Sequence, residues 1–428
     1  MKRMPLFLLA GALAAQAPPY DLLLKSGHVI DPKNGVSAIR DVAIRDGKIA
    51  AVSPSIAPSL ARKTVPVAGL YVTPGLIDIH AHVFSGPNGP MLAGGDWSIF
   101  PDTFAFRTGV TTVVDAGSSG RHNFAEFKRT VIDRSRARVL VFLNILGAGM
   151  PGDNLEQDVA DMDAKAAGAL AIANRDTIVG IKVAHYRGPD WVPLERGVEA
   201  ASLAGIPVMI DFGTFRPERP FQELVLNKLR PGDIYTHAFY GAVPLLDGKG
   251  KVLPYLFEAR KRGVLFDVGH GGAALIFRQA APAVRQAFPP DSISTDVHAG
   301  SLLAGMKDML NVMSKFLNMG MTLDGVILRS TWNPARQIHR EELGHLSVGA
   351  LADLAVLRLE KGDFGFVDSL GARLPGDRRL QCELTIQNGL VVYDQNGITR
   401  DNWDKLGNYS AQGDRSWDAT RETGRRRR

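Results

Sequence analysis

The chain has 428 residues, of which 45% are hydrophobic and 22% charged, the composition of an ordinary globular protein. Its formal net charge of +6 comes from the two ends, where Lys2 and Arg3 stand near the start and Arg425–Arg428 close the chain. The rest of the chain is neutral, which argues against a basic surface for nucleic acid. The length allows one large barrel-type domain and a smaller one, followed by a solvated basic tail at residues 411–428.

Residues 1–17 have the pattern of a secretory signal peptide. A basic start leads into the apolar run Met4–Ala15, and small residues at 15–17 form a cleavage site. Because the run is too short for a permanent span, we expect an exported protein, periplasmic or secreted, with no stable membrane span after cleavage. The alternative is a frayed apolar N-terminus on a cytosolic enzyme. Cys382 is the single cysteine, which excludes an internal disulfide.

Short strands separated by turns are predicted at both ends of the chain. They are expected at Asp21–Lys25, Asp41–Arg45, Lys48–Val52, Asp353–Leu357, Glu383–Ile386 and Leu390–Tyr393. Asp-Gly at 46–47 and Asn-Gly at 388–389 are hairpin turn signals. Between them, Phe364–Asp377 is expected to be an irregular excursion. The two β-rich ends, residues 18–71 and 346–410, predict one composite β-sandwich domain.

The middle of the chain, residues 72–345, alternates apolar strand-like runs with helix-like stretches. The eight runs are Thr73–His82, Val110–Ala116, Arg138–Leu146, Ile178–His185, Pro207–Phe212, Asp233–Phe239, Val264–His270 and Ser292–His298. Helices are expected at Asp158–Arg175, Val198–Leu203, Phe221–Leu229, Pro254–Arg262 and Leu275–Phe288. Apolar runs of this kind are typical of parallel strands buried on both faces. Eight of them predict an α/β fold with a closed (β/α)8 TIM barrel.

His80 and His82 end the first run two positions apart. Side chains at i and i+2 of a strand point to the same face, so these two imidazoles can aim at one point. That is a ligand geometry suited to zinc and similar ions. Two surface histidines at a strand end remain the alternative, so the choice depends on further ligands elsewhere.

Polar residues gather at the ends of the other runs as well, where TIM barrels carry their chemistry. These residues are Lys182, Asp211, His237, His270, Asp296 and His298. Six of the ten histidines lie at such ends. A metal centre would satisfy several of these polar groups together, which favours a metal site.

Each candidate also has a structural reading. Lys182 could be a buried ion-pair partner, or its amine could be carboxylated by CO2 to give an anionic ligand able to bridge two cations. Asp211 could be a salt-bridge acid and His270 a structural histidine. His185 stands an odd number of positions from Lys182, so strand alternation favours a structural or peripheral role. Asp296 has the strongest functional reading, because an acid there can bind metal and take a proton.

The segments Pro74–His82 and Val348–Leu354, with Lys182, His237 and Asp296, resemble the amidohydrolase superfamily of metal-dependent hydrolases. The resemblance extends over nearly all of the chain after the signal segment. Within the superfamily the chain is most similar to the dihydroorotase-like branch and its deacetylase-type relatives. This branch carries a carboxylated lysine on its fourth strand that bridges two metals.

The resemblance implies two divalent metals, zinc at both sites or manganese at the second. The implied ligands are His80, His82 and Asp296 for the first metal, carboxylated Lys182 as the bridge, and Asp211 and His237 for the second. The family usually has histidine on the fifth strand, where this chain has Asp211. An aspartate would make the second site harder and more anionic.

The implied reaction is hydrolysis of a small amide or cyclic amide, such as an N-acyl amino acid or a dihydroorotase-like substrate. Metal-bound hydroxide would attack, with Asp296 as general base. Candidate substrate-binding residues are His270, His298, Asn144 and Arg187. Export argues against a pyrimidine-biosynthetic dihydroorotase, whose substrate is cytosolic. An esterase, deacetylase or lactonase on the same site and a non-catalytic metal-binding protein stay open. A homo-oligomer is expected from the fold.

Overall fold

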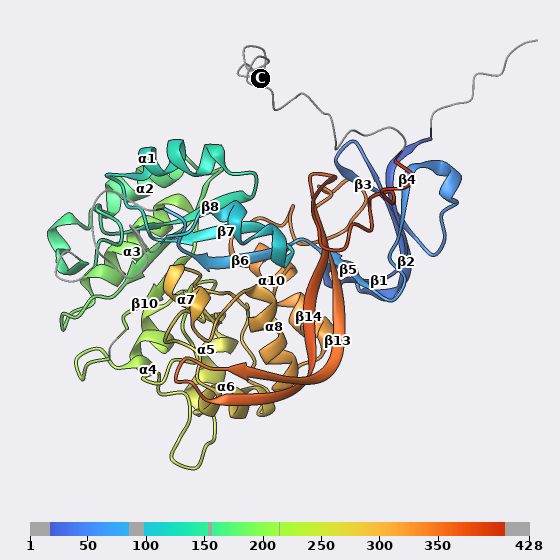
Figure 1. Cartoon of the computed structure of the whole chain (residues 1–428). Helices are drawn as coiled ribbons and strands as arrows, with labels where there is room; N and C mark the ends of the chain where they lie inside the picture. The colour runs from blue at the N-terminus through green and yellow to red at the C-terminus, as the bar shows by residue number, and fades with distance from the viewer. Residues whose placement is uncertain (1–17, 85–97, 153–155, 214, 407–428) are drawn as a thin grey trace, which may run out of the picture.

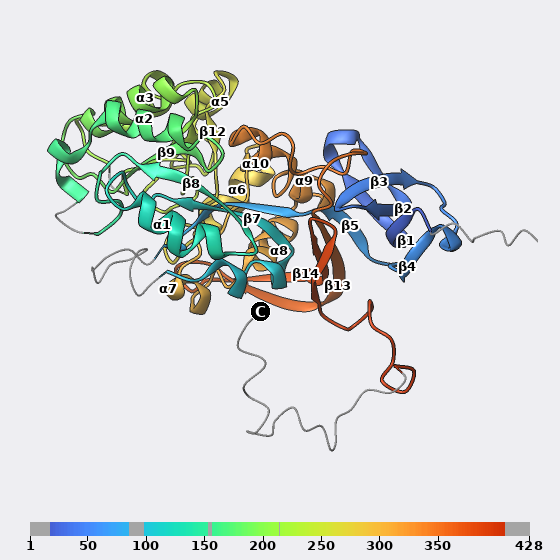
Figure 2. The same ribbon diagram turned by 90° about the horizontal axis from the view of Figure 1, so that it is seen from above.

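The computed structural model describes residues 18–84, 98–152, 156–213 and 215–406. The predicted signal peptide and the tail at 411–428 lie outside these residues. Two sheets organise the described chain, and Figures 1 and 2 show them as a barrel with a smaller β-domain beside it. Among the described residues, no helix combines the length and the apolar character that crossing a membrane requires.

The smaller domain is one sheet built from both ends of the chain. Its strands run in the order β15-β14-β13-β5-β1-β2-β3, and β4 pairs with β1. They are β1 (Tyr20–Asp31), β2 (Val36–Arg45), β3 (Lys48–Ser53), β4 (Ala61–Pro66), β5 (Tyr71–Pro74), β13 (Leu354–Val367), β14 (Arg373–Gln387) and β15 (Leu390–Asp394). The central contact is the antiparallel pairing of β5 with β13, which places Leu354 opposite Pro74. The sheet therefore joins the first and last parts of the described chain.

The expectation of an irregular segment at Phe364–Asp377 is wrong. The segment belongs to a long hairpin of β13 and β14, in which Phe366 pairs with Leu374. Cross-strand ion pairs, such as Arg358 with Glu383, stabilise it. Figures 1 and 2 show the hairpin running from the small domain along the barrel beside α8 (Met309–Asn318). The charges and glycines of Phe364–Asp377 are typical of a loop. The pairing of β13 with β14 depends on the contact of the hairpin with the barrel.

The barrel contains seven parallel strands in sequential order. They are β6 (Leu76–Ala81), β7 (Val110–Ala116), β8 (Arg138–Asn144), β9 (Ile178–Ala184), β10 (Val208–Asp211), β11 (Ile234–Tyr235) and β12 (Leu265–Phe266). The predicted first run is divided at Gly75, so that β5 joins the small domain and β6 the barrel. A Cβ at Gly75 would lie 2.2 Å from the Thr111 hydroxyl oxygen, so a glycine is required at this break.

The eighth side of the barrel is an irregular segment instead of the predicted strand Ser292–His298. Parallel bridges from Ser292 to Asp267 and from Val297 to Ala81 close the ring. Side-chain hydrogen bonds replace part of the backbone hydrogen-bond ladder here. The buried carboxylate of Asp267 accepts from the hydroxyls of Ser292 and Ser294. The predicted (β/α)8 barrel with a composite β-domain is confirmed, with this eighth element less regular than expected.

Helices surround the strands (Figure 2). They are α1 (Phe124–Thr130), α2 (Ala164–Ala173), α3 (Val192–Ala204), α4 (Phe221–Glu223), α5 (Pro254–Lys261), α6 (Phe277–Arg285), α7 (Ala299–Leu303), α8, α9 (Leu323–Leu328) and α10 (Trp332–Gln337). A π-helical turn, Leu224–Lys228, continues α4. Several begin at caps that satisfy free backbone N–H groups, as where Asp163 accepts from Ala166 N at the start of α2. The carboxyl ends of the barrel strands stay open to a pocket.

Candidate active site

A pocket of about 630 Å³ lies at the carboxyl ends of the barrel strands. The predicted site residues in its wall are His80, His82, Lys182, Arg187, Asp211, His237, Asp296 and His298. Met150, Phe212 and Tyr240 add apolar surface. The size and the mixture of apolar wall with a few converging polar groups are typical of a small-molecule site.

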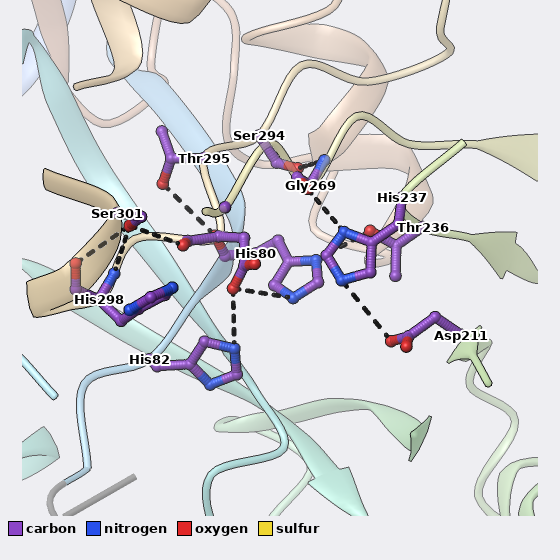
Figure 3. Close-up of polar contacts among 12 residues, drawn as sticks. His80, His82, Asp211, Thr236, His237, Gly269, Ser294, Thr295, His298 and Ser301 are labelled. Atoms are coloured by element: carbon purple, nitrogen blue, oxygen red, sulfur yellow. Dashed lines mark hydrogen bonds and ion pairs between the residues drawn. The ribbon is translucent and has the colours of Figure 1, made fainter. Parts of the chain in front are cut away.

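His80, in β6, and His82, directly after this strand, meet Asp296 from the eighth side of the barrel. Asp296 Oδ1 lies 3.0 Å from His82 Nε2 and 3.5 Å from His80 Nε2. One ligand atom from each of these three side chains lies within 4.8 Å of the other two. Among the described residues, they are the set of three or more His, Cys, Asp or Glu side chains with this spacing. Figure 3 shows His80 and His82 turned toward the same space. Two imidazoles and a carboxylate converging from one side suit a zinc-type ion.

The protonation of His80 is set by the groups behind it. Thr236 Oγ1 donates to Asp267 Oδ2 at 2.8 Å and lies 2.8 Å from His80 Nδ1. Since the single hydroxyl proton goes to the carboxylate, Nδ1 of His80 carries a proton and donates it to Thr236. The lone pair is then on Nε2, which faces the pocket. This arrangement orients metal-binding histidines in proteins.

His82 is held in the same way from the neighbouring strand. Its Nδ1 lies 3.0 Å from Ser118 Oγ. Ser118 N and Val83 N both donate to the carboxylate of Asp115, which is buried at the end of β7. Burial raises the pKa of Asp115, and the charge of His82 works against that rise. The loop that supports His82 is therefore itself fixed by a buried acid.

Asp296 is an ionised acid at the pocket floor. Burial alone would raise its pKa, but the hydrogen bond and the charge of His82 lower it below the ordinary value. Its backbone has the left-handed value φ 49°, which costs about 1–2 kcal/mol for a residue with a Cβ. Such strain persists only where the surrounding structure imposes it, and it is concentrated at functional sites.

Lys182 and Asp211 form the opposite wall, from β9 and β10. Lys182 Nζ lies 3.0 Å from Asp211 Oδ2, and both side chains are almost completely buried. The angles of this contact leave both atoms without a hydrogen-bond partner. Gly117 makes room for the lysine stem, because a Cβ there would lie 2.6 Å from Lys182 Cγ. Buried polar atoms left without a hydrogen bond fit a site that takes up a further charged group.

His237 and His185 flank Asp211. His237 Nε2 lies 3.8 Å from Asp211 Oδ2, while its Nδ1 lies 2.6 Å from the carbonyl oxygen of Gly269 (Figure 3). His185 Nε2 lies 3.7 Å from Asp211 Oδ1, and its Nδ1 lies 2.7 Å from Glu156 Oε2. Both histidines have left-handed backbones, with φ 59° and φ 57°. The sequence favoured a peripheral place for His185, whereas the structure places it in the pocket wall.

Burial and neighbouring charge set the ionisation of these groups. Burial lowers the pKa of His80 well below its ordinary range, and the Lys182 ammonium lowers it further, so this ring is neutral. Burial opposes ionisation of Asp211, but the charge of Lys182 outweighs it and lowers the pKa. Burial likewise lowers the pKa of His185, but the carboxylates of Asp211 and Glu156 raise it to about 9. An ionised Asp211 is thus held between two cationic side chains.

The four candidate substrate residues divide into two pairs. Arg187 is exposed and His298 nearly buried, and both line the pocket. Asn144 instead braces the loop after β8, donating to the Gly117 carbonyl and accepting from Leu146 N. His270 is fully buried behind the wall, with its Nε2 2.6 Å from Lys315 Nζ. Asn144 and His270 are not among the residues that line the described pocket.

Several supporting residues were absent from the sequence prediction. They are Asp115, Ser118, Glu156, Thr236, Asp267 and Lys315. Asp115 stands next to the end of the predicted strand Val110–Ala116, so the strand-end rule could have found it. Thr236 and Asp267 directly follow β11 and β12, but these strands are shorter than predicted, and both residues stand in the middle of the predicted runs. Glu156 and Lys315 lie on a loop and a helix, where no spacing pattern marks them.

Comparison with known proteins assigns the chain to one family. A model of the amidohydrolase family matches residues 277–389. A deacetylase of Agrobacterium fabrum is 34% identical over 334 residues, which are 76% of this chain and 80% of the deacetylase. The chain belongs to the amidohydrolase superfamily. This amidohydrolase is a hydrolase that acts on carbon–nitrogen bonds, in a family that typically binds divalent metals.

Two solved structures resemble this amidohydrolase over most of its length. An adenine deaminase is 29% identical, with a TM-score of 0.79, covering 88% of this chain and 100% of its own. A dihydroorotase is 30% identical, with a TM-score of 0.76, covering 87% of this chain and 99% of its own. The barrel and the composite domain are thus shared by enzymes of different named activities.

Proposed function

We propose that this amidohydrolase is a metal-dependent hydrolase of small amides or cyclic amides, with N-acyl amino acids as the first class to test. The observation that carries the proposal is the convergence of His80 Nε2, His82 Nε2 and Asp296 Oδ1 on one point of a pocket large enough for a small molecule. The name of the Agrobacterium relative, a deacetylase, supports cleavage of an acetyl group from its substrate.

The residues present fit two divalent ions, zinc in both places or manganese in the second. His80, His82 and Asp296 would hold one, while Asp211 and His237 would hold the other. A bound divalent ion would supply acidity for the attacking water and polarisation of the substrate carbonyl. Asp296 is ionised and takes the water proton at its carboxylate, then returns it to the leaving nitrogen.

Lys182 fits carboxylation by CO2 at Nζ. Its side chain is buried, and its Nζ faces Asp211 without a hydrogen bond. A carbamate there would replace the ammonium by an anion with two oxygens, able to serve both metal positions. Growth in 13C-labelled bicarbonate should produce a carbamate carbon signal in the NMR spectrum of the purified enzyme, and Lys182→Ala should remove it.

The pocket wall indicates the kind of substrate. Phe212 and Tyr240 offer apolar contact for an acyl group or a hydrophobic side chain. Arg187 stands exposed at the pocket and suits a substrate carboxylate, which an arginine binds through two parallel hydrogen bonds. His298 lies on the same side as Asp296 and suits the acyl oxygen. An N-acyl amino acid combines these features.

The test is the double variant His80→Ala/His82→Ala, with His122→Ala as control. His122 is an exposed histidine paired with Asp161, outside the residues that line the pocket. The double variant should lose bound metal and activity on N-acyl amino acids and cyclic amides, while the control keeps both. Full activity in the double variant would refute the proposal. Faster cleavage of acetyl esters than of any amide would favour the esterase, and bound metal without turnover of any substrate would favour a binding protein.

We also propose that the enzyme is exported and assembles as a homo-oligomer. The basic and apolar pattern of residues 1–17 supports export. N-terminal sequencing of the protein from cell fractions should find a mature chain beginning at Pro18 outside the cytoplasm. Light scattering of the purified enzyme tests the assembly, and a monomer would contradict it.

A further inference from the structure

His185 follows β9 directly and lines the pocket beside Asp211, yet the proposed reaction gives it no role. The two oxygens of Asp211 each face one imidazole. Oδ2 lies 3.8 Å from His237 Nε2, and Oδ1 lies 3.7 Å from His185 Nε2. His185 is thus the counterpart of His237 on the other side of the same carboxylate.

The two rings are also held in the same way from behind. His185 Nδ1 lies 2.7 Å from Glu156 Oε2, and His237 Nδ1 lies 2.6 Å from the Gly269 carbonyl oxygen. Carboxylates and carbonyls only accept, so both Nδ1 atoms carry the proton. Nε2 is therefore the pocket-side nitrogen of both rings. On His185 the carboxylates of Asp211 and Glu156 favour a proton there, and a bound divalent ion would replace that proton. A ring fixed by an acceptor at Nδ1, with Nε2 turned to the ion, is the usual state of a metal-binding histidine.

Glu156 is itself held in place. Its Oε1 accepts a hydrogen bond from Gly152 N, which leaves Oε2 directed at His185. The side chain is buried, so the contact is not a solvent-exposed ion pair of little consequence. Carboxylate–histidine pairs of this kind orient a ligand ring and raise its basicity.

The backbone of His185 is held in a conformation that turns its ring into the pocket. Its φ is 57°, whereas the preceding residues of β9 are extended. Regular strand alternation would have placed the ring on the face opposite Lys182. Hydrogen bonds hold the turn, because His185 N donates to the Asp211 carbonyl and His185 O accepts from Gln157 Nε2. Strain of this kind at a pocket indicates a functional demand.

We propose that His185 is a ligand of the second metal ion, together with Asp211 and His237, and that Glu156 positions it. The proposal rests on the proposed function, because it assumes a metal at the first position. It makes the second position a site of two imidazoles and one carboxylate. Two nitrogens and one oxygen form a donor set that zinc commonly takes, and binding would draw together three ligand atoms that do not all lie within 4.8 Å of one another in the structure.

The test measures metal binding directly, on the full-length metal-loaded enzyme. His185→Asn is the main variant, because asparagine tolerates left-handed backbone better than other residues. Its matched control is His122→Asn, which removes another histidine paired with a carboxylate but away from the pocket lining. Glu156→Gln is a second variant that keeps His185 and weakens only its support. Metal content after dialysis and zinc titration by calorimetry are the readouts.

His185→Asn should bind one ion fewer than the parent, and the ion held by His80 and His82 should stay. Glu156→Gln should weaken the second ion by about 10–100-fold. The control should match the parent. An unchanged number and affinity of ions in His185→Asn would overturn the proposal and leave His185 as an ion-pair link between Glu156 and Asp211. If that variant does not fold, unchanged zinc affinity in Glu156→Gln overturns it.

Failure of the proposed function gives a different result. A parent enzyme that binds no metal, or a His80→Ala/His82→Ala variant with full activity, would refute metal-dependent hydrolysis itself. The other outcome is a parent enzyme that binds metal, a His80→Ala/His82→Ala variant without activity, and a His185→Asn variant with unchanged metal content. That outcome refutes only the present proposal.

Discussion

The hydroxyl oxygen of Thr236 lies 2.8 Å from His80 Nδ1, and the hydroxyl donates its hydrogen bond to Asp267 Oδ2. This one contact decides which nitrogen of His80 faces the pocket with a lone pair. His80 lies in β6, whereas Thr236 and Asp267 directly follow β11 and β12, beyond the irregular eighth segment, so the tautomer of His80 depends on the closure of the ring. A side chain with no place in the proposed reaction thus controls a candidate metal ligand.

Thr236→Val keeps the shape of the side chain and removes the hydroxyl. We expect metal affinity to fall by about 10–100-fold, the usual effect of losing a group that orients a ligand. Zinc titration by calorimetry measures it. Thr236→Ser, which keeps the hydroxyl, should bind metal nearly as well as the parent. Equal affinity in the valine and serine variants would contradict this role.

Gly117→Ala tests the space that Lys182 occupies. The new Cβ would lie 2.6 Å from Lys182 Cγ, at a residue with φ 90°. We expect the free energy of unfolding to fall by about 2–4 kcal/mol, from the left-handed backbone and the overlap together. Gly205→Ala is the control, because it has φ 68° with nothing within 4 Å of its Cβ. It should lose only about 1–2 kcal/mol. Urea unfolding compares the two, and equal losses would refute the steric argument.

Lys315 should make stability depend on pH. Burial, with the charge of Lys307 acting in the same direction, lowers its pKa from 10.5 to about 7. Between these values the unfolded chain binds the proton and the folded chain does not, so stability should rise with pH across this window. Lys315→Met should flatten that rise, and Lys261→Met, on an exposed part of α5, should not. Urea unfolding from neutral to alkaline pH measures it. A rise of the same slope in both variants would show that another group is responsible.

The strand-end rule located the metal-site candidates because the barrel gathers the carboxyl ends of all strands at one face. Where a run was regular, as at Val110–Ala116, the predicted bounds equal those of β7. His80 and His82 face one point although β6 ends at Ala81, because His82 is still bound to the eighth side of the barrel, where its N–H donates to the Val297 carbonyl. The position of Asp296 did not depend on a regular strand, since its side chain reaches the pocket from a residue with left-handed backbone.

His185 shows where this reasoning stops. Alternation applies only inside a strand, and β9 ends at Ala184, one residue before it. The left-handed turn that follows redirects the ring, and no pattern in the sequence reports that turn. Glu156 lies on a separate loop, and its approach to His185 follows from the packing of the barrel. The same limit explains Asn144 and His270. Asn144 ends β8, but its side chain turns to backbone. His270 was expected at a strand end, but β12 ends at Phe266, and the ring of His270 lies against Lys315.

The hairpin of β13 and β14 could not be predicted from its own sequence, because it is held by contacts with the barrel. Leu380 N donates to Ser314 Oγ of α8, and the Phe277 backbone N–H donates to Asp368 near the tip. Glycines and charges at 362–365 and 375–377 weaken a strand in isolation, so local patterns favoured a loop. Docking on the barrel supplies what the local sequence lacks.

The pairing of β5 with β13 gives the enzyme a late step in its synthesis. β5 ends at Pro74, and β6, which contains His80 and leads directly into His82, begins two residues later. The partner strand β13 leaves the ribosome only after the whole barrel has been made, a delay on the order of tens of seconds at ordinary rates of translation. Until then β5 is paired with β1 alone and β6 with β7, and the other edge of β5 stays open. The small domain is therefore completed only when the last strands arrive, and the strand that leads into His80 and His82 is paired on both edges only then.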